Sequence, residues 1–108
     1  MDAHRLAEER SLAFHEAVAA RIAVDPGVLE RARSRVRGWL AACDVPPHYA
    51  REWEAVLALP PDAIRTFLVE RGERAGELRQ STPFAGALSP RERWRIWRDV
   101  AARMRRAA

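Results

Sequence analysis

The clearest amphipathic pattern in the chain is DPGVLERARSRVRGWLAAC, residues 25–43. Its arginines, at positions 31, 33, 35 and 37, lie off the face that carries the apolar residues. Because such a helix buries one stripe against other elements, the pattern predicts that helix packing builds the core. We expect Asp25 to be the N-cap and Pro26 the first helical residue. The predicted core stripe consists of Leu29, Ala32, Val36, Trp39, Leu40 and Cys43.

Helical signals continue on both sides of this stretch. Phe14, Val18 and Ile22 form an i, i+4, i+8 stripe in a helix predicted over residues 3–24. We expect Gly72 to be the C-cap of a later helix. The later helical segments lie between proline breaks, over residues 47–58 and 61–71, followed by a short helical turn over 73–79.

The last predicted helix, about residues 89–106, begins with a strong start signal. Ser89 is the expected N-cap, Pro90 the first helical residue and Glu92 the third. In this arrangement the Ser89 hydroxyl accepts from the Glu92 amide, while the Glu92 carboxylate reaches back to the Ser89 amide. The sequence therefore predicts a capping box at this point.

Length and composition limit the class of protein. The chain has 108 residues, of which 48% are hydrophobic and 31% charged, which is typical of a globular domain and not of a disordered one. No segment shows sustained period-2 alternation, so strands are not expected. We therefore predict an all-α fold, a single-domain bundle of about five helices spanning residues 1–108. One cysteine excludes an intrachain disulfide, and the chain shows no signal peptide or membrane span, so we expect a cytoplasmic protein.

The basic charge of the chain is concentrated near its C-terminus. All 19 basic residues are arginines, a usage that indicates a high-GC bacterial genome. Residues 1–88 carry 12 Arg and 13 Asp or Glu, a net charge of −1. Residues 89–108 carry seven Arg and two acids, a net charge of +5. The last predicted helix therefore holds the whole positive excess.

The same helix has two tryptophans, and these allow two interpretations. Trp94, Trp97, Ala101 and Met104 fall on one stripe, with Val100 beside it, so the tryptophans are either core residues or part of a binding surface. Arg93 and Arg98 lie four residues from Trp97 and Trp94, so cation–π pairs are expected. Phe84, in the loop before the helix, either plugs the core or anchors a partner. The candidate partner-binding residues are Phe84, Arg91, Trp94, Arg95, Trp97 and Arg98.

No pattern in the sequence indicates catalysis or metal binding. The three histidines are His4, His15 and His48. His4 and His15 could share a helix face, but no carboxylate joins them as a metal site, and Glu8, one helical turn from His4, makes only a single weak pair. The five glycines form no phosphate-binding loop, and no Ser/His/Asp set has a recognisable spacing. We therefore expect a protein that binds a partner, with no enzymatic activity, no metal site and no cofactor.

Three stretches together resemble a known kind of protein. They are QSTPFAGALSPRERWRIWR (80–98), RLAEERSLAFHEAVAARI (5–22) and DPGVLERARSRVRGWL (25–40). The chain resembles small antitoxin-like helical proteins of high-GC bacteria, the antitoxin half of two-gene toxin–antitoxin modules. The resemblance implies that it binds and neutralises a cognate toxin. It further implies that Arg91, Arg95 and Arg98 pair with toxin carboxylates while Phe84 and Trp94 or Trp97 anchor the contact.

Two other functions fit the basic helix less well. A nucleic-acid-binding or transcription-regulating protein would use the arginines to contact phosphates. Against this alternative, residues 1–88 are net acidic and contain no convincing helix-turn-helix pattern. An interfacial membrane helix would also be basic and contain tryptophan. The capping box and the arginines on further helical faces disfavour it, so we expect no membrane partner.

Overall fold

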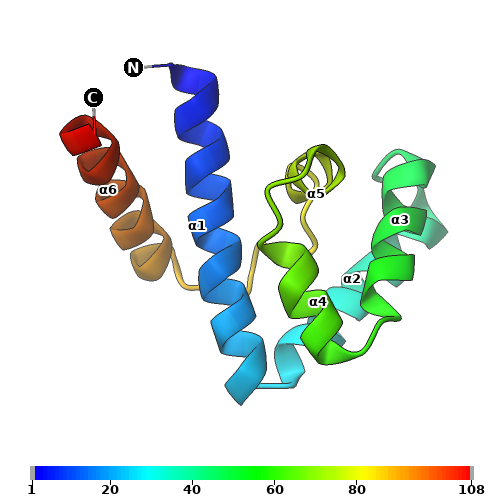
Figure 1. Cartoon of the computed structure of the whole chain (residues 1–108). Coiled ribbons are helices and arrows are strands. Elements are labelled where there is room, and N and C mark those ends of the chain that lie inside the picture. The colour runs from blue at the N-terminus through cyan, green and yellow to red at the C-terminus, as the bar shows by residue number, and fades with distance from the viewer. Residues whose placement is uncertain (1, 108) are drawn as a thin grey trace.

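A long helix, α1 (Ala3–Val24), lies at the centre of the computed structural model, which describes residues 2–107. α6 (Pro90–Ala107) packs along one side of α1, and the other helices lie on the opposite side (Figure 1). α1 contacts α2, α4, α5 and α6, whereas α3 packs mainly on α2. The remaining helices are α2 (Gly27–Ala42), α3 (Pro47–Leu57), α4 (Pro61–Leu68) and α5 (Glu73–Arg79).

The predicted all-α fold is confirmed, and the helices lie close to their predicted bounds. The described residues form six helices, whereas the sequence predicted about five. The additional helix is α5, the segment that was predicted as a helical turn over 73–79. Ala75, Leu78 and Arg79 of this short helix are buried. Because a helix of two turns is marginal by itself, this packing is what makes it a stable element.

Two of the predicted helix starts are present in atomic detail. α2 starts at Gly27 with Pro26 at the N-cap position, one residue later than predicted, but the Asp25 carboxylate still accepts from the Gly27 amide at 2.9 Å. At α6, the Glu92 amide donates to the Ser89 hydroxyl at 3.1 Å, and the Ser89 amide donates to Glu92 Oε1 at 3.0 Å. This is the predicted capping box. The short-range signals in the sequence therefore fix where α2 and α6 begin.

Two predicted positions were wrong, both at helix ends. Cys43 is exposed and not in the core, because α2 ends at Ala42 and the backbone at Cys43 turns left-handed, with φ 57°. Gly72 does not cap the helix before it, since α4 ends at Leu68 and Gly72 precedes α5 in an extended conformation. The Arg79 guanidinium instead donates to the Leu68 and Glu70 carbonyls, at 3.3 and 2.5 Å. These carbonyls therefore need no left-handed glycine cap.

Phe84 belongs to the core, so its expected role as an exposed anchor is wrong. Only 1% of its surface is exposed. Its ring is one link in a series of edge-to-face aromatic contacts, with ring centroids 5.1–6.4 Å apart. The series crosses the molecule from α6 to α4, in the order Trp97, Phe14, His15, Phe84, Trp53 and Phe67. Phe84 therefore ties the loop before α6 to the rest of the core.

His15 fixes the same loop by hydrogen bonds. Its Nδ1 lies 2.7 Å from the Ser11 carbonyl, which can only accept, so Nδ1 carries the proton and donates. Nε2 then accepts from the Thr82 hydroxyl at 2.8 Å, and that hydroxyl accepts from the Phe84 amide at 3.1 Å. Burial lowers the pKa of His15 from 6.5 to about 4. The network therefore requires the neutral imidazole.

Protonation of His15 should destabilise the fold. The unfolded chain binds this proton with the ordinary pKa of 6.5, whereas the folded chain binds it near pH 4. The stabilisation is thus complete above about pH 6.5 and is lost as the pH falls toward 4. We expect the free energy of unfolding to drop by about 2 kcal/mol between pH 7 and pH 5, in urea titrations followed by circular dichroism.

Two variants serve as controls for this prediction. His15→Met removes the titrating ring and should flatten the profile between pH 7 and pH 5, even if the variant is less stable at pH 7. His48→Gln, at an exposed position in α3, should keep the full pH dependence. Parallel profiles for wild type and His15→Met would contradict the assignment.

Candidate functional site

α6 contacts the rest of the bundle through a narrow inner face. In the described part of the chain, α1 is the one helix against which α6 packs. Val100 is the fully buried residue of α6, and Ile96, Trp97 and Met104 are half-buried around it. The buried stripe is therefore centred on Val100, and it leaves out Trp94, which the sequence placed on the same stripe as Trp97. The difference arises because the contact with Phe14 of α1 draws in Trp97.

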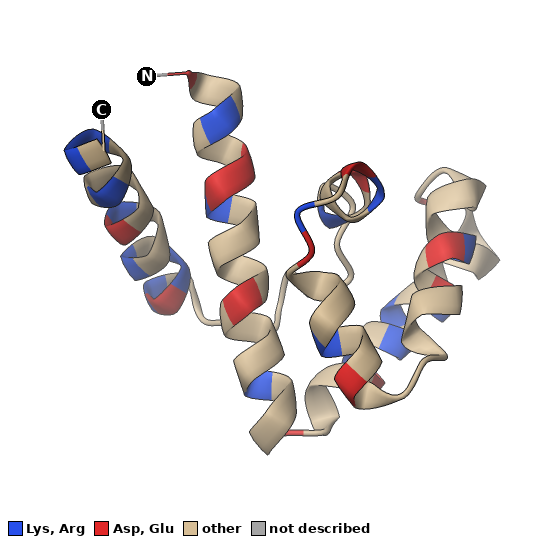
Figure 2. Ribbon diagram, viewed as in Figure 1, with Lys and Arg blue, Asp and Glu red and all other residues tan. Residues whose placement is uncertain are grey.

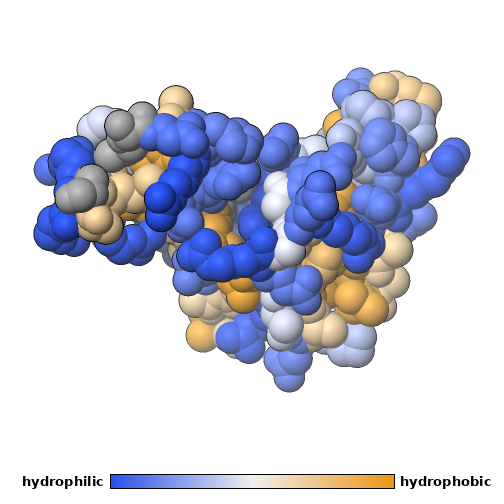
Figure 3. All heavy atoms as spheres, turned by 45° about the horizontal axis from the view of Figure 1, so that its top comes forward, coloured by the Kyte–Doolittle hydropathy of each residue, from blue (hydrophilic) through white to orange (hydrophobic). Residues whose placement is uncertain are grey.

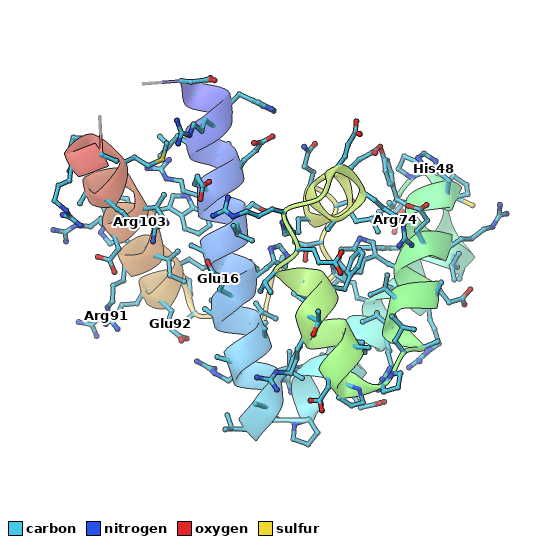
Figure 4. All side chains as sticks on the ribbon, in the orientation of Figure 1. Glu16, His48, Arg74, Arg91, Glu92 and Arg103 are labelled. Atoms are coloured by element: carbon cyan, nitrogen blue, oxygen red, sulfur yellow. The ribbon has the colours of Figure 1, made fainter. Side chains whose placement is uncertain are left out.

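The outer face of α6 carries most of the predicted site. Arg91, Trp94, Arg95 and Arg98 follow one another at spacings of three, one and three residues, so they share the face that points away from α1. Figure 2 shows the arginine bands along α6, and Figure 4 shows the Arg91 side chain pointing away from α1. Trp94 is 64% exposed. An exposed tryptophan among arginines has the composition of an interface hot spot.

A hollow of about 580 Å³ extends from this face of α6 to Arg10 of α1. Five of the six predicted partner-binding residues line it, namely Arg91, Trp94, Arg95, Trp97 and Arg98, whereas Phe84 lies elsewhere, in the core. The hollow also contains Arg10 of α1 and Arg105, with Ala101 and Ala102 as small residues in its lining. In Figure 3, the end of the molecule that carries both chain termini is largely hydrophilic, with apolar atoms between the polar groups. We call the surface of Arg91, Trp94, Arg95 and Arg98 the outer face.

The two tryptophans of α6 have different roles. Trp97 packs edge-to-face on Phe14, with ring centroids 6.3 Å apart. The Arg93 guanidinium lies 5.9 Å from the Trp97 ring and 6.0 Å from the Phe14 ring, which confirms the predicted Arg93–Trp97 pair. Among the described residues, no such contact joins Arg98 to Trp94. Trp97 therefore attaches α6 to α1, and Trp94 is left for contacts outside the molecule.

The arginines of α6 differ from those of the other helices in their partners. Several arginines of the other helices are paired within the molecule, as in the salt bridge of Arg71 to Glu9 at 2.9 Å and the bond from Arg65 to the Ala19 carbonyl at 2.9 Å. No arginine of α6 forms a salt bridge with a carboxylate of another residue between 2 and 107. The outer face therefore presents unpaired guanidinium groups.

Glu92, one of the two acidic residues of α6, helps to hold the helix in place. Glu92 pairs with Arg21 of α1, and the Ser89 amide that donates to it keeps its pKa below the usual range. Its charge thus serves the helix start and the contact with α1. Asp99 is the other acid and lines the hollow. A single carboxylate does not neutralise the arginines there.

Arg10 was missed in the sequence. It lies on α1, far along the chain from the basic helix, yet it lines the hollow beside Trp97. Its local sequence carries no distinguishing signal, because α1 has acids and other arginines on each side of it. Only the packing of α6 on α1 brings it to the site.

The part of the chain that the structure describes contains no cluster of metal-ligating side chains. Between residues 2 and 107, no three His, Cys, Asp or Glu side chains are placed to hold a metal ion. His4 pairs with Glu8 at 2.9 Å as an exposed couple on one helical turn. None of the helices in this range has the length and apolar character needed to cross a bilayer. The outer face of α6 is therefore the candidate site.

Comparison of this chain with protein-family models, with curated proteins and with solved structures finds no match. The assignment of function must therefore rest on the site itself and on the sequence resemblance described above.

Two alanine substitutions test whether the Trp94 side chain contributes to the stability of the fold. Trp94→Ala should change the free energy of unfolding by less than about 0.5 kcal/mol, because the side chain lies outside the core. Trp53→Ala should lower it by about 3–5 kcal/mol, because Trp53 is 0% exposed and donates to the Leu78 carbonyl. Urea unfolding followed by circular dichroism measures both. A loss above about 2 kcal/mol for Trp94→Ala would place this residue in the core after all.

Proposed function

We propose that the chain binds an acidic protein partner through the outer face of α6, and that it acts as an antitoxin that neutralises a cognate bacterial toxin. One observation carries the proposal. Trp94 is 64% exposed and lies among arginines that have no carboxylate partner between residues 2 and 107. A surface of this kind gains free energy when carboxylates of another protein cover it.

The chemistry of the outer face favours a carboxylate-rich surface on the partner. Arg91, Arg95 and Arg98 present planar guanidinium forks, which bind carboxylates through two parallel hydrogen bonds. Trp94 supplies a large apolar contact at the centre of this group. A toxin whose active cleft is lined by acids offers the complementary surface. The antitoxin would then act by covering the cleft, without turnover.

The resemblance to antitoxin-like proteins supports the same proposal, and its residues can be located in the structure. Its most specific part, residues 80–98, contains both the loop of Thr82 and Phe84 and the start of α6. Thr82 is hydrogen-bonded to His15, and Phe84 is buried. We therefore assign this loop the task of positioning α6, and the outer face the task of binding.

Charge reversal on the outer face is the direct test. In R91E/R95E/R98E, three attractive contacts become repulsive. Binding to the proposed toxin, the protein encoded by the gene next to that of this chain, should therefore weaken at least ~100-fold. Binding is measured by calorimetry with the purified pair. Co-expression gives a second readout, in which wild type relieves growth arrest by the partner and the variant does not.

A matched variant separates the surface from the total charge. R35E/R37E/R51E reverses three exposed arginines of α2 and α3 and therefore makes the same change in net charge. It should bind within about threefold of wild type, apart from weaker long-range attraction at low salt. Circular dichroism must show both variants folded. Equal binding by R91E/R95E/R98E and the control would rule out the outer face.

Nucleic acid remains the second candidate, because residues 89–108 carry a net charge of +5 and Trp94 offers a stacking surface. The two functions differ in their salt dependence. Phosphate binding by three to four arginines should lose about tenfold or more in affinity for a 20-base-pair DNA duplex between 50 and 200 mM salt. Fluorescence anisotropy that detects no binding at 50 mM salt would eliminate this candidate.

A further inference from the structure

A second hollow, of about 550 Å³, opens on another side of the α1–α6 contact. It lies between the first half of α1, the end of α5 with the loop after it, and the start of α6. Its apolar lining includes the rings of Phe14 and Trp97 and the side chain of Leu6. We call it the inner pocket. Volumes of this order are typical of sites for small organic molecules.

The charges around the inner pocket are all of one sign. Arg10, Arg79 and Arg93 line it, and no aspartate or glutamate does. Arg79 already donates to the Leu68 and Glu70 carbonyls. It therefore contributes positive charge to the pocket but few free hydrogen-bond donors. Arg93 lies over the Phe14 and Trp97 rings without a carboxylate partner among residues 2–107. The charged side chains that line the pocket therefore favour an anion over a cation.

Arg10 adds a specific donor. Its Nε is buried, and it is the one buried side-chain nitrogen or oxygen between residues 2 and 107 that has no hydrogen-bond partner. Buried donors of folded proteins are almost always paired, because an unpaired one retains the whole cost of losing its hydration. The Arg10 side chain also lines the inner pocket, so its guanidinium group can donate to a ligand bound there. A carboxylate is the acceptor that a guanidinium binds most strongly.

We propose that the inner pocket binds a small organic carboxylic acid with an aromatic body. The body would lie against Phe14, Trp97 and Leu6, and the carboxylate would accept from Arg10 and face Arg93. Such a ligand matches both properties of the pocket, since a hydrophilic anion leaves the rings uncovered and a neutral apolar molecule leaves the guanidinium groups unpaired. The inner pocket shares Arg10 and Trp97 with the other hollow, whereas Arg93, Phe14 and Leu6 line the inner pocket alone.

The probe for this site is naphthalene-2-carboxylate, with naphthalene-2-carboxamide as its neutral counterpart. A ligand of this size should bind with a dissociation constant of roughly 1 mM or tighter. The amide should bind about tenfold more weakly, because it keeps the shape and loses the charge-assisted hydrogen bonds. Titration followed by ¹H–¹⁵N NMR measures both. The indole signal of Trp97 should shift, whereas those of Trp53 and Trp94 should stay in place.

Two variants test whether Arg10 and Arg93 bind the carboxylate of the ligand. Arg10→Gln and Arg93→Gln should each weaken naphthalene-2-carboxylate about tenfold and leave the carboxamide nearly unchanged. Arg51→Gln, an exposed arginine of α3, should bind both compounds as wild type does. If either pocket variant fails to fold, the other still tests the proposal, because each lies on a different helix.

Three results would overturn the proposal. They are equal affinity for acid and amide, equal affinity of wild type and both pocket variants, or no shift at Trp97 up to about 10 mM acid, well above the expected constant. A peptide segment of the toxin is the other occupant that such a pocket suits. If toxin binding expels the naphthoate in competition titrations and the acid alone shows no preference over the amide, the pocket belongs to the protein contact. The role of the outer face is tested separately, because Arg91, Arg95 and Arg98 do not line the inner pocket.

Discussion

The series of edge-to-face aromatic contacts is the interaction on which the position of α6 depends. α6 buries only Val100 fully, so the apolar area that it gives to the core is small. The ring of Trp97 meets Phe14, and from there contacts continue through His15 and Phe84 into the centre of the bundle. Each such pair contributes about 0.5–1.5 kcal/mol beyond the burial of its area. α6 is therefore held by a few directional contacts, and its other sides remain open.

The arginines show how one residue type serves two purposes in this chain. In the bundle they complete hydrogen bonding that the backbone leaves open. Arg33 donates to the Leu57 carbonyl at the end of α3, and Arg79 to the Leu68 carbonyl at the end of α4. The bonds of Arg79 take the place of the single glycine cap, at Gly72, that the sequence led us to expect. Among the described residues, no arginine of α6 donates to a carbonyl at a helix end, and Arg93 instead packs over the Phe14 and Trp97 rings.

Local signals in the sequence predicted the helices well. The capping box of Ser89 and Glu92, the cap at Asp25 and the proline breaks involve residues within three positions of one another, so the sequence alone contains them. The same is true of the Arg93–Trp97 pair, which one helical turn brings together. Outcomes that depend on distant partners were not predictable in this way.

Cys43, Gly72 and Phe84 are the residues that show this limit. Helical spacing extended the core stripe to Cys43, but a left-handed turn one residue after α2 redirects its side chain. Gly72 looked like a cap, but Arg79 from the next helix satisfies the carbonyls at the end of α4. Phe84 is buried because its ring packs against rings from other elements, among them His15 of α1. The local sequence does not show these contacts. The candidate site had the same limit, since its arginines were visible in the sequence and the place of Arg10 beside them was not.

The basic helix also carries an internal repulsion that bears on its function. Arg91 and Arg95 are four residues apart and Arg95 and Arg98 three, and like charges at these spacings destabilise a helix by about 0.2–0.5 kcal/mol per pair. The capping box and the attraction of the C-terminal arginines to the helix dipole offset part of this cost. Carboxylates of a partner would remove the repulsion in addition to forming new hydrogen bonds. Relief of the repulsion between these arginines would therefore add to the affinity for an acidic partner. A neutral partner of the same shape would not relieve it.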